Sequence, residues 1–343
     1  MNIKIDKSNS IGLNKKPLII AEISGNHNGK KRLFLKHIKV AAKNGADLVK
    51  IQTYEPQDIT LKDVAKKFKL KKGIWKKKDL WNIYQKAHTP FKWHEDAFKL
   101  AKKLKITLFS TPFSTRAVDF LEKFKVPLYK ISSFEITDHQ LINYIAKKKK
   151  PIILSTGMAS LNEIRSAIKI IKKHHSKIVI LYCVSGYPTK EVESNLNTIK
   201  FLRKKFKNIN IGLSDHTNDI LTSLIATSLG ATVIEKHFII SKKINSLDNK
   251  FSIDVKQLKD LSKNINKVKL SIGKKNKKIK KVEKNNLKLR RSIYAITDIT
   301  KGEKLTEKNI RSYRPKIGIG AENFFKILSL KTKKHLKKVH LFI

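Results

Sequence analysis

Two histidines in this 343-residue sequence each close an apolar segment of the kind that forms strands. His216 follows Asp215 at the end of one such segment, and His237 follows Glu235 by two residues at the end of the next. Neighbouring strands lie ~4.8 Å apart, so both imidazoles could reach one ion. Two imidazoles without a thiolate leave room for water and substrate oxygens, which suits a divalent ion such as manganese or magnesium. A histidine at a strand end can also be a hydrogen-bonded structural residue, and this alternative stays open.

Two lysines inside apolar segments indicate a pocket for an anion. Lys50 lies in Leu-Val-Lys-Ile and Lys130 lies in Leu-Tyr-Lys-Ile. A buried ammonium group is costly unless an anion lies beside it. Small hydroxyl side chains near the ends of other segments fit a phosphate or carboxylate pocket, namely Thr111, Ser133, Ser155 and Ser214. Glu22 and Glu235 are acid/base candidates or, alternatively, the counter-ions of these lysines.

A regular succession of strands and helices must position these side chains. Segments with helical spacing of apolar residues, such as Leu33–Asn44 and Ser160–Lys173, follow apolar strand-like segments. Eight repeats over about 250 residues predict an α/β fold, a (β/α)8 TIM barrel, whose active site lies at the carboxyl ends of the strands. A doubly wound open sheet is the alternative, but the sequence lacks its glycine-rich dinucleotide turn. The expected strands are Leu18–Ser24, Asp47–Tyr54, Ile106–Phe113, Leu128–Glu135, Pro151–Met158, Lys177–Pro188, Asn210–Thr217 and Thr232–Ile239.

The expected barrel domain covers residues 1–272, and a linker at 273–286 joins it to a small module at 287–343. The linker is rich in Lys and Asn and interrupts the strand–helix pattern. Within the barrel domain, Leu61–Trp93 is an insertion that holds all three tryptophans. It is interpreted either as a lid packed by its own aromatic residues or as an apolar wall over the barrel mouth.

The composition is strongly basic, with 76 Lys and Arg against 27 Asp and Glu, a net charge of +49. Only eight of the 76 are Arg, whereas proteins that read bases rely on the bidentate guanidinium group. We interpret the charge as a solvated coat and expect no specific nucleic-acid partner; a basic nucleic-acid-binding protein is the alternative from another class. The single cysteine and the absence of a long apolar run or signal peptide predict a cytoplasmic protein without a disulfide or membrane span. No motif calls for an organic cofactor.

Seven motifs, in order, resemble those of the sialic acid synthase family, and the match runs from about residue 18 to 320. The motifs are Ile20–Gly29, Lys50–Thr53, Ser110–Phe113, Lys130–Glu135, Ser155–Met158, Gly212–Thr217 and Ile234–Phe238. The tail from Arg290 to Pro315 resembles that family's antifreeze-protein-like (SAF) domain. Leu330–Ile343 lacks the lysine–glycine turn expected late in that domain, which predicts a truncated end.

The resemblance implies a role for each candidate residue. The metal ligands would be His216 and His237. Phosphoenolpyruvate would bind to Lys50, Thr111, Lys130, Ser133, Ser155 and Ser214. The sugar would face Gln52, Tyr187 and Asp248. Glu22 would lie beside the carbon that gains water, and Glu235 near the metal and the aldehyde. Arg314 would reach into the barrel of a partner subunit, which implies a homodimer with exchanged small domains.

Within the family, the Gly73-Ile74-Trp75 turn, the Thr89–His94 stretch and Phe134 resemble the pseudaminic acid synthase branch. That branch implies condensation of phosphoenolpyruvate with 2,4-diacetamido-2,4,6-trideoxy-L-altrose and water, with phosphate released by C–O cleavage and pseudaminic acid as the product. N-acetylneuraminate and legionaminate synthases, which use other amino sugars, are the near alternatives. They tend to have glycine where Phe134 stands, and neuraminate synthases carry Asn where this chain has Ser185. An aldolase with a Schiff-base lysine is the distant alternative.

Overall fold

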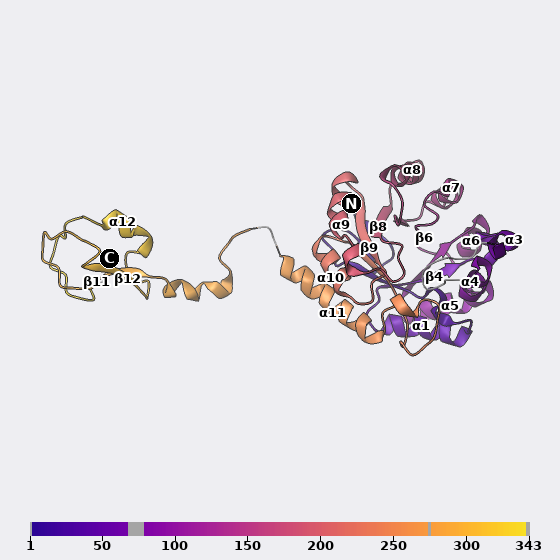
Figure 1. Ribbon diagram of the computed structural model, residues 1–343, viewed down its shortest axis with the longest axis horizontal. Coiled ribbons are helices and arrows are strands. Elements are labelled where there is room, and N and C mark those ends of the chain that lie inside the picture. The colour runs from indigo at the N-terminus through magenta and orange to yellow at the C-terminus, as the bar shows by residue number, and fades with distance from the viewer. Residues whose placement is uncertain (1, 68–78, 274–275, 341–343) are drawn as a thin grey trace. The chain divides into compact units, whose positions relative to one another are not determined.

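The computed structural model describes residues 2–67, 79–273 and 276–340. The chain divides into two compact units, Met1–Gly273 and Lys274–Ile343 (Figure 1). The first unit contains the strands and helices of the predicted barrel, and the second is a small module with two short strands.

The first unit is a closed barrel of eight parallel strands, which confirms the predicted TIM-barrel fold. Neighbouring strands in the chain pair with each other, and the last strand pairs with the first to close the barrel. Each strand lies inside a segment predicted to be a strand. The strands are β3 (Leu18–Glu22), β4 (Leu48–Thr53), β5 (Thr107–Pro112), β6 (Tyr129–Ile131), β7 (Ile152–Ser155), β8 (Ile178–Cys183), β9 (Asn210–Asp215) and β10 (Val233–His237).

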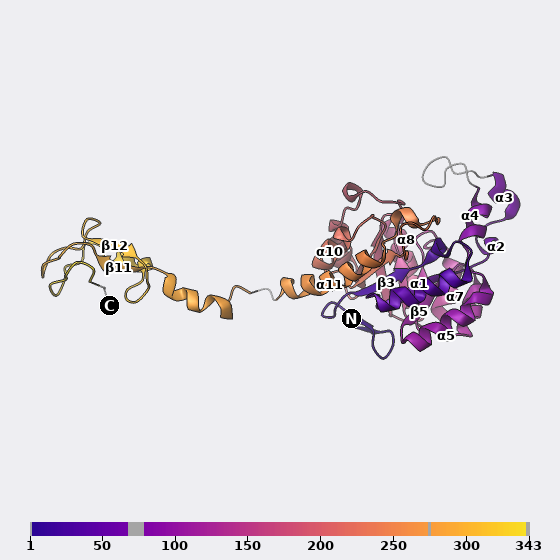
Figure 2. The ribbon, with the colours of Figure 1, turned by 90° about the horizontal axis from the view of Figure 1, so that it is seen from below.

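Helices follow the strands and surround the barrel (Figures 1 and 2). The eight main ones are α1 (Lys31–Lys43), α5 (His94–Leu104), α6 (Thr115–Glu122), α7 (His139–Lys147), α8 (Leu161–Lys172), α9 (Asn197–Lys205), α10 (Leu221–Ser228) and α11 (Val255–Ile272). A capping box begins α8, because the Ser160 hydroxyl accepts from the Glu163 amide and the Glu163 carboxylate accepts from the Ser160 amide. Within the described residues, no helix is both long and apolar enough to span a bilayer.

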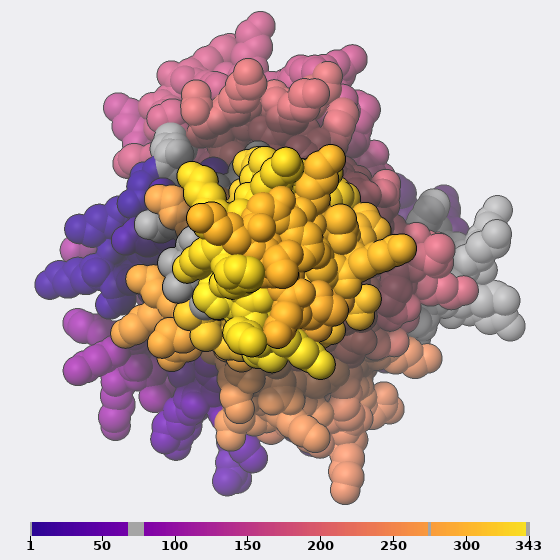
Figure 3. All heavy atoms as spheres, turned by 90° about the vertical axis from the view of Figure 1, so that its left-hand side faces the viewer, coloured from indigo at the N-terminus to yellow at the C-terminus, as the bar shows by residue number. Residues whose placement is uncertain are grey.

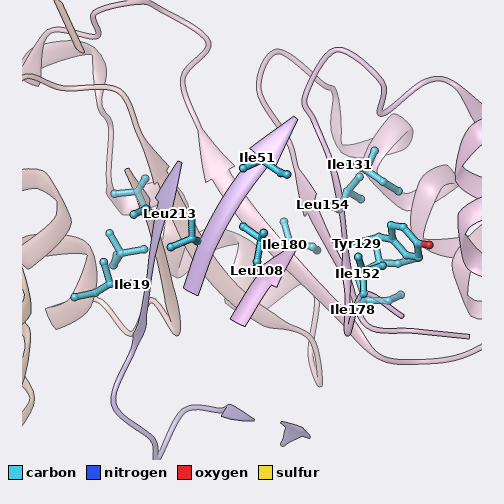
Figure 4. Packing of buried hydrophobic residues seen from close by; sticks show 14 of the residues in the cluster. Ile19, Ile51, Leu108, Tyr129, Ile131, Ile152, Leu154, Ile178, Ile180 and Leu213 are labelled. Carbon is cyan, nitrogen blue, oxygen red and sulfur yellow. The ribbon is translucent and has the colours of Figure 1, made fainter. Parts of the chain in front are cut away.

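The interior of the barrel changes from apolar to polar along the strands. Side chains alternate between the two faces of a strand, and outward-facing residues such as Ile19 pack against the helices (Figure 4). The inward-facing Ile20 and Leu48 belong to a second apolar cluster near the amino ends of the strands. Two residues further along, the inward positions are Glu22 and Lys50. Polar side chains therefore meet inside the barrel at the carboxyl ends of the strands, where barrel enzymes place their active sites.

A small hairpin contributes to the apolar cluster inside the barrel. Its strands are β1 (Ile3–Lys4) and β2 (Ser10–Ile11), which pair antiparallel. Ile3, Ile5 and Ile11 join the inward-facing apolar residues of the barrel. The hairpin thereby completes the part of the core that lies opposite the polar end.

The insertion between β4 and α5 forms short helices in its described part. These are α2 (Pro56–Ile59), α3 (Lys62–Lys67), α4 (Leu80–Ala87) and η2 (Phe91–Trp93). The two tryptophans in its described part differ in setting. Trp93 is buried and its ring packs against His27 and Phe34. Trp81 is partly buried on α4, and Trp75 lies outside the described residues.

The second unit has its own small core. Strands β11 (Ser292–Ala295) and β12 (Ile310–Tyr313) pair antiparallel, and α12 (Phe324–Ile327) packs nearby. The unit also contains three short helical turns, η5 (Lys281–Glu283), η6 (Asn285–Leu289) and η7 (Ala321–Asn323). The last described segment takes part, because Leu336 is buried and bridges to Ile299. Figure 3 shows the side chains that cover one face of this unit (orange to yellow).

Candidate active site

Four ionisable side chains form a buried cluster inside the polar end of the barrel. The Lys50 Nζ atom lies 2.8 Å from Glu235 Oε1 and 3.4 Å from Glu22 Oε2. The Lys130 Nζ atom lies 3.3 Å from the same Glu235 Oε1. Each of the four residues is at most 4% exposed. They come from β3, β4, β6 and β10, and the inward direction of their side chains brings them together.

The two carboxyl groups of this cluster differ in their affinity for a proton. Burial raises the pKa of Glu22, and the nearby Lys50 offsets only part of this effect. Burial would also raise the pKa of Glu235, but Lys130 and Lys50 outweigh it and lower the pKa below its usual range. Burial lowers the pKa of Lys130, while for Lys50 the two carboxylates outweigh burial and raise the pKa. Glu235 is therefore the fixed anion, and Glu22 is the carboxyl group suited to exchanging a proton.

Hydroxyl groups surround the charged cluster, and several lack partners. Ser214 donates a hydrogen bond of 3.1 Å to Glu235 Oε1. Among the described residues, the buried hydroxyls of Thr111 and Ser155 and the second carboxylate oxygen of Glu235 find no hydrogen-bond partner, and Glu22 Oε2 has only its ion pair with Lys50 at 3.4 Å. Buried polar atoms are nearly always hydrogen-bonded in proteins. A set of unpaired donors and acceptors beside two ammonium groups is what a pocket for a polar anion provides.

The loop after β7 gives Ser133 its place beside this pocket. Gly157 has a φ of +48°, and a Cβ at this position would lie 2.3 Å from the Cβ of Ser133. Only glycine fits both requirements. The Ser133 hydroxyl lies 3.1 Å from the hydroxyl of Ser185, and the Gly157 amide donates to Cys183 Sγ. Close packing of three loops therefore fixes the Ser133 hydroxyl.

The two histidines lie together in an aromatic cluster. The ring centroids of His216 and His237 are 5.5 Å apart; Tyr187 lies 4.4 Å from His216, and Phe251 lies 4.8 Å from His237. The Nδ1 atom of His216 donates to the Val184 carbonyl at 2.8 Å, which leaves Nε2 without a proton in the neutral ring. Burial lowers the pKa of His216 to about 3, so this ring is neutral at pH 7.

The histidine pair fits a divalent cation with few protein ligands. A carbonyl that holds one imidazole nitrogen is the usual way to orient the other toward a metal. His237 Nδ1 is buried without a hydrogen-bond partner in the described chain, and Asp248 Oδ2 lies 3.6 Å away, beyond hydrogen-bond distance. Within the described residues, no group of three or more His, Cys, Asp and Glu side chains surrounds one metal position. A metal held here would therefore take further ligands from water and substrate.

A cavity of about 310 Å³, within the size range of small-molecule sites, is lined in part by His237. Gln52 connects it to the buried cluster by donating to Glu22 Oε1 at 2.9 Å and to Ser24 at 3.0 Å. Asp248 accepts from the Gly25 amide at 3.2 Å. Five of the residues predicted from the sequence line this cavity: Gln52, Ser133, Tyr187, His237 and Asp248.

Two residues, Asp215 and Arg314, are not inward-facing residues of the barrel strands. Asp215, which flanks His216 in the sequence, points outward from β9 and pairs with Lys236 at 3.1 Å. Its carboxylate also accepts from Thr222 and Ser223, so it belongs to a buried structural network under α10. Arg314 belongs to the second unit, where its side chain is exposed. The predicted site residues other than Arg314 all belong to the barrel unit.

Sequence reasoning missed several residues that line the cavity. Four of them lie on α4 of the insertion: Leu80, Ile83, Tyr84 and Ala87. Their spacing of i, i+3, i+4 and i+7 is the signal of one helix face, and it was available in the sequence. Phe134, singled out as a marker of one family branch, also lines the cavity and is 61% exposed.

Comparisons with known proteins identify the family. The family model described as "NeuB family" matches residues 37–277. The pseudaminic acid synthase of Helicobacter pylori is 41% identical over 324 residues, which cover 94% of this chain and 95% of that protein. The chain belongs to the NeuB family of sialic acid synthases. This confirms the resemblance found in the sequence, and the chain is accordingly an enzyme, a transferase-type synthase.

Two further NeuB-family relatives bear on the choice of sugar and on the fold. The N,N'-diacetyllegionaminic acid synthase of Campylobacter jejuni is 39% identical over 332 residues, covering 95% of this chain and 99% of that protein. A crystal structure of the N-acetylneuraminic acid synthetase of Leptospira borgpetersenii, in complex with citrate, matches with a TM-score of 0.75 and 29% identity. It covers 84% of this chain and 95% of that chain. The comparisons therefore establish the family. The relatives described above are named for three different products: pseudaminic acid, N,N'-diacetyllegionaminic acid and N-acetylneuraminic acid.

Proposed function

We propose that this enzyme condenses phosphoenolpyruvate with 2,4-diacetamido-2,4,6-trideoxy-L-altrose and water to give pseudaminic acid and phosphate. The observation that carries the proposal is the buried cluster of Lys50 and Lys130 with its unpaired hydroxyls, which Gln52 connects to a sugar-sized cavity. The 41% identity to a pseudaminic acid synthase over most of both chains supports this choice of sugar.

The proposed reaction consists of bond changes in a definite order, which the charged residues of the cluster assist. Carbon 3 of phosphoenolpyruvate forms a bond to the aldehyde carbon of the open-chain sugar, and the aldehyde oxygen takes up a proton. Water adds to carbon 2, and the bond from carbon 2 to the bridging oxygen breaks, so that this oxygen leaves with the phosphate. Lys50 and Lys130 neutralise the phosphate and carboxylate groups. Glu22, whose pKa burial raises, accepts the proton of the attacking water.

The histidine pair suits a divalent cation such as manganese or magnesium in this scheme. His216 and His237 would hold it, and it would supply Lewis-acid polarisation of the aldehyde. The chain's own contribution is to keep His216 neutral and oriented through the Val184 carbonyl. Asp248 and Gln52 would then bind hydroxyl or amide groups of the sugar beside it.

We further propose that the active enzyme is a homodimer whose second units, as SAF domains, are exchanged. Lys274–Ile343 forms a compact unit of its own, and a module of this size is marginally stable without a docking surface. Arg314 lies exposed on it beside Arg290 and Arg291. Placed over the partner's barrel, the guanidinium group of Arg314 would add hydrogen bonds to the sugar.

The 39% identity to a legionaminic acid synthase makes N,N'-diacetyllegionaminic acid the second candidate product. Release of phosphate from phosphoenolpyruvate, measured with a panel of sugars, separates the two. The panel contains the L-altrose derivative, 2,4-diacetamido-2,4,6-trideoxy-D-mannose and N-acetylmannosamine. We expect the highest kcat/KM with the first, and a higher value with either of the others would refute the proposed product. Phosphoenolpyruvate labelled with ¹⁸O at the bridging position should give labelled phosphate, whereas unlabelled phosphate would contradict C–O cleavage.

A further inference from the structure

The short helix α4 presents one apolar face to the cavity. Leu80, Ile83, Tyr84 and Ala87 all line the cavity, and they occupy successive turns of one side of the helix. Residues between them, such as Asn82 and Gln85, are exposed to solvent. The amphipathic character of α4 is therefore directed at the cavity.

The contacts of α4 with the rim of the barrel fix this face in position. A Cβ on Gly25, in the turn after β3, would lie 3.3 Å from the Cβ of Ala87, so the absence of a side chain lets the helix approach closely. The Tyr84 ring packs edge-on against Tyr54 at 6.1 Å, and Tyr54 packs against Phe113 at 5.0 Å. The wall is thus packed against residues that closely follow β3, β4 and β5, which suits a surface that selects a ligand by shape.

The polar and apolar parts of the cavity assign a direction to the sugar. His237, Asp248 and Gln52 line its polar part, next to the buried lysine cluster where the aldehyde must react. The carbons furthest from the aldehyde then face the rest of the lining, which includes Ser132, Phe134 and Glu135 as well as the α4 face. On α4 this lining offers aliphatic side chains and a single hydroxyl group, that of Tyr84.

We infer that the α4 wall, formed by Leu80, Ile83, Tyr84 and Ala87, is a specificity determinant that selects a methyl group at carbon 6 of the sugar over a hydroxymethyl group. This inference rests on the proposed function and assigns a part of the substrate to a part of the enzyme. A methyl group on the wall is buried against apolar side chains, whereas a hydroxyl group there loses water without gaining a full set of partners.

The expected size of the effect follows from known limits of apolar pockets. Such pockets reject an added hydroxyl group by roughly 10- to 200-fold in kcat/KM, because the binding energy at stake is small. We therefore expect the enzyme to prefer the 6-deoxy sugar over its 6-hydroxy counterpart by a factor of that order. Replacing one wall residue with a polar residue of similar shape should remove about tenfold of this preference.

The test compares Leu80→Asn with a matched control, Leu61→Asn. Leu80 lines the cavity, whereas Leu61 lies in the same insertion, is 71% exposed and is not part of the lining. For each protein, kcat/KM is measured with 2,4-diacetamido-2,4,6-trideoxy-L-altrose and with the corresponding 6-hydroxy sugar. Leu80→Asn should lower the ratio of the two values about tenfold, and Leu61→Asn should leave it unchanged. Ile83→Thr, a second wall variant with a similar expected shift, covers the case in which Leu80→Asn fails to fold.

Two different results would overturn the inference. If the wall variants lower kcat/KM equally for both sugars, the ratio stays constant and α4 is only a scaffold, while the proposed function stands. If the unmodified enzyme releases no phosphate with the 6-deoxy sugar but does so with a 6-hydroxy sugar, both the inference and the proposed product are wrong. The measurement on the unmodified enzyme thus separates the two failures.

Discussion

Lys130 is the better placed of the two buried lysines to bind an incoming anion. Its Nζ atom lies 3.3 Å from Glu235 Oε1, whereas Lys50 approaches the same oxygen at 2.8 Å and also contacts Glu22. Burial lowers the pKa of Lys130, which shows that Glu235 does not fully compensate its charge. An anion beside Lys130 would supply the missing compensation.

The substitution Lys130→Met removes the charge and keeps most of the side-chain volume. Glu235 would retain Lys50 and Ser214 as partners, so we expect the fold to survive. Breaking a desolvated pair between Lys130 and the phosphate or carboxylate of phosphoenolpyruvate costs on the order of 2–5 kcal/mol. At about 1.4 kcal/mol per factor of ten, this corresponds to a Kd raised by roughly 30-fold or more.

The assay measures phosphate release while one substrate is varied and the other is saturating. The KM for phosphoenolpyruvate should rise at least ~30-fold, and the KM for the sugar by less than about threefold. Calorimetric titration with phosphoenolpyruvate alone should show the same loss of affinity. Lys150→Met is the control, because Lys150 precedes β7 at the opposite end of the barrel and pairs with Glu122. Equal increases in both KM values would refute the assignment of Lys130 to phosphoenolpyruvate.

Three further predictions test other parts of the molecule. His216→Ala and His237→Ala should each lose bound divalent metal, measured by elemental analysis, and lose activity with little change in melting temperature; active wild-type enzyme without metal would contradict this. Mixed dimers of His237→Ala and Arg314→Ala should regain partial activity if Arg314 acts in the partner's barrel, and a mixture that stays inactive after confirmed subunit exchange would exclude this arrangement. Burial lowers the pKa of His37 from 6.5 to about 4, so only the unfolded chain takes up a proton between these pH values and stability is lost as the pH falls. Urea titrations at pH 7 and 4.5 should show that this group lowers the free energy of unfolding by up to roughly 3 kcal/mol at the lower pH, and His37→Gln should remove this loss. If the free energy of unfolding of the variant depends on pH as strongly as that of the wild type, the prediction is wrong.

The sequence was most informative where strand alternation decides which way a side chain points. Leu18, Ile20 and Glu22 share one face of β3, so a strand predicted at the right position already places the carboxyl group inside the barrel. The same alternation places Asp215 on the outer face of β9, although it directly precedes His216 in the sequence. Applying the alternation rule to each strand would have separated Asp215 from Glu235.

The α4 wall could not be predicted in the same way. The spacing of Leu80, Ile83 and Tyr84 predicts an amphipathic helix, but the spacing does not say what covers its apolar face. That depends on contacts distant in the sequence, such as the approach of Ala87 to Gly25. The position of Phe251 beside His237 depends likewise on the path of the loop after β10.

The three buried lysines of the described chain show why a lysine-rich composition does not obscure the site. Lys236 is buried on the outer face of β10, and its partner Asp215 is saturated by hydrogen bonds from Thr217, Thr222 and Ser223. A network in which all members are paired stabilises the fold, and it offers no unpaired donor or acceptor to a ligand. Lys50 and Lys130 are equally buried, but they share one oxygen of Glu235 while unpaired oxygen atoms surround them. Burying charges in an incompletely paired network is costly for stability, and such a cost is expected where a substrate completes the network. The difference between the two sites lies in hydrogen-bond saturation, which depends on the face of the strand and cannot be judged from the number of lysines.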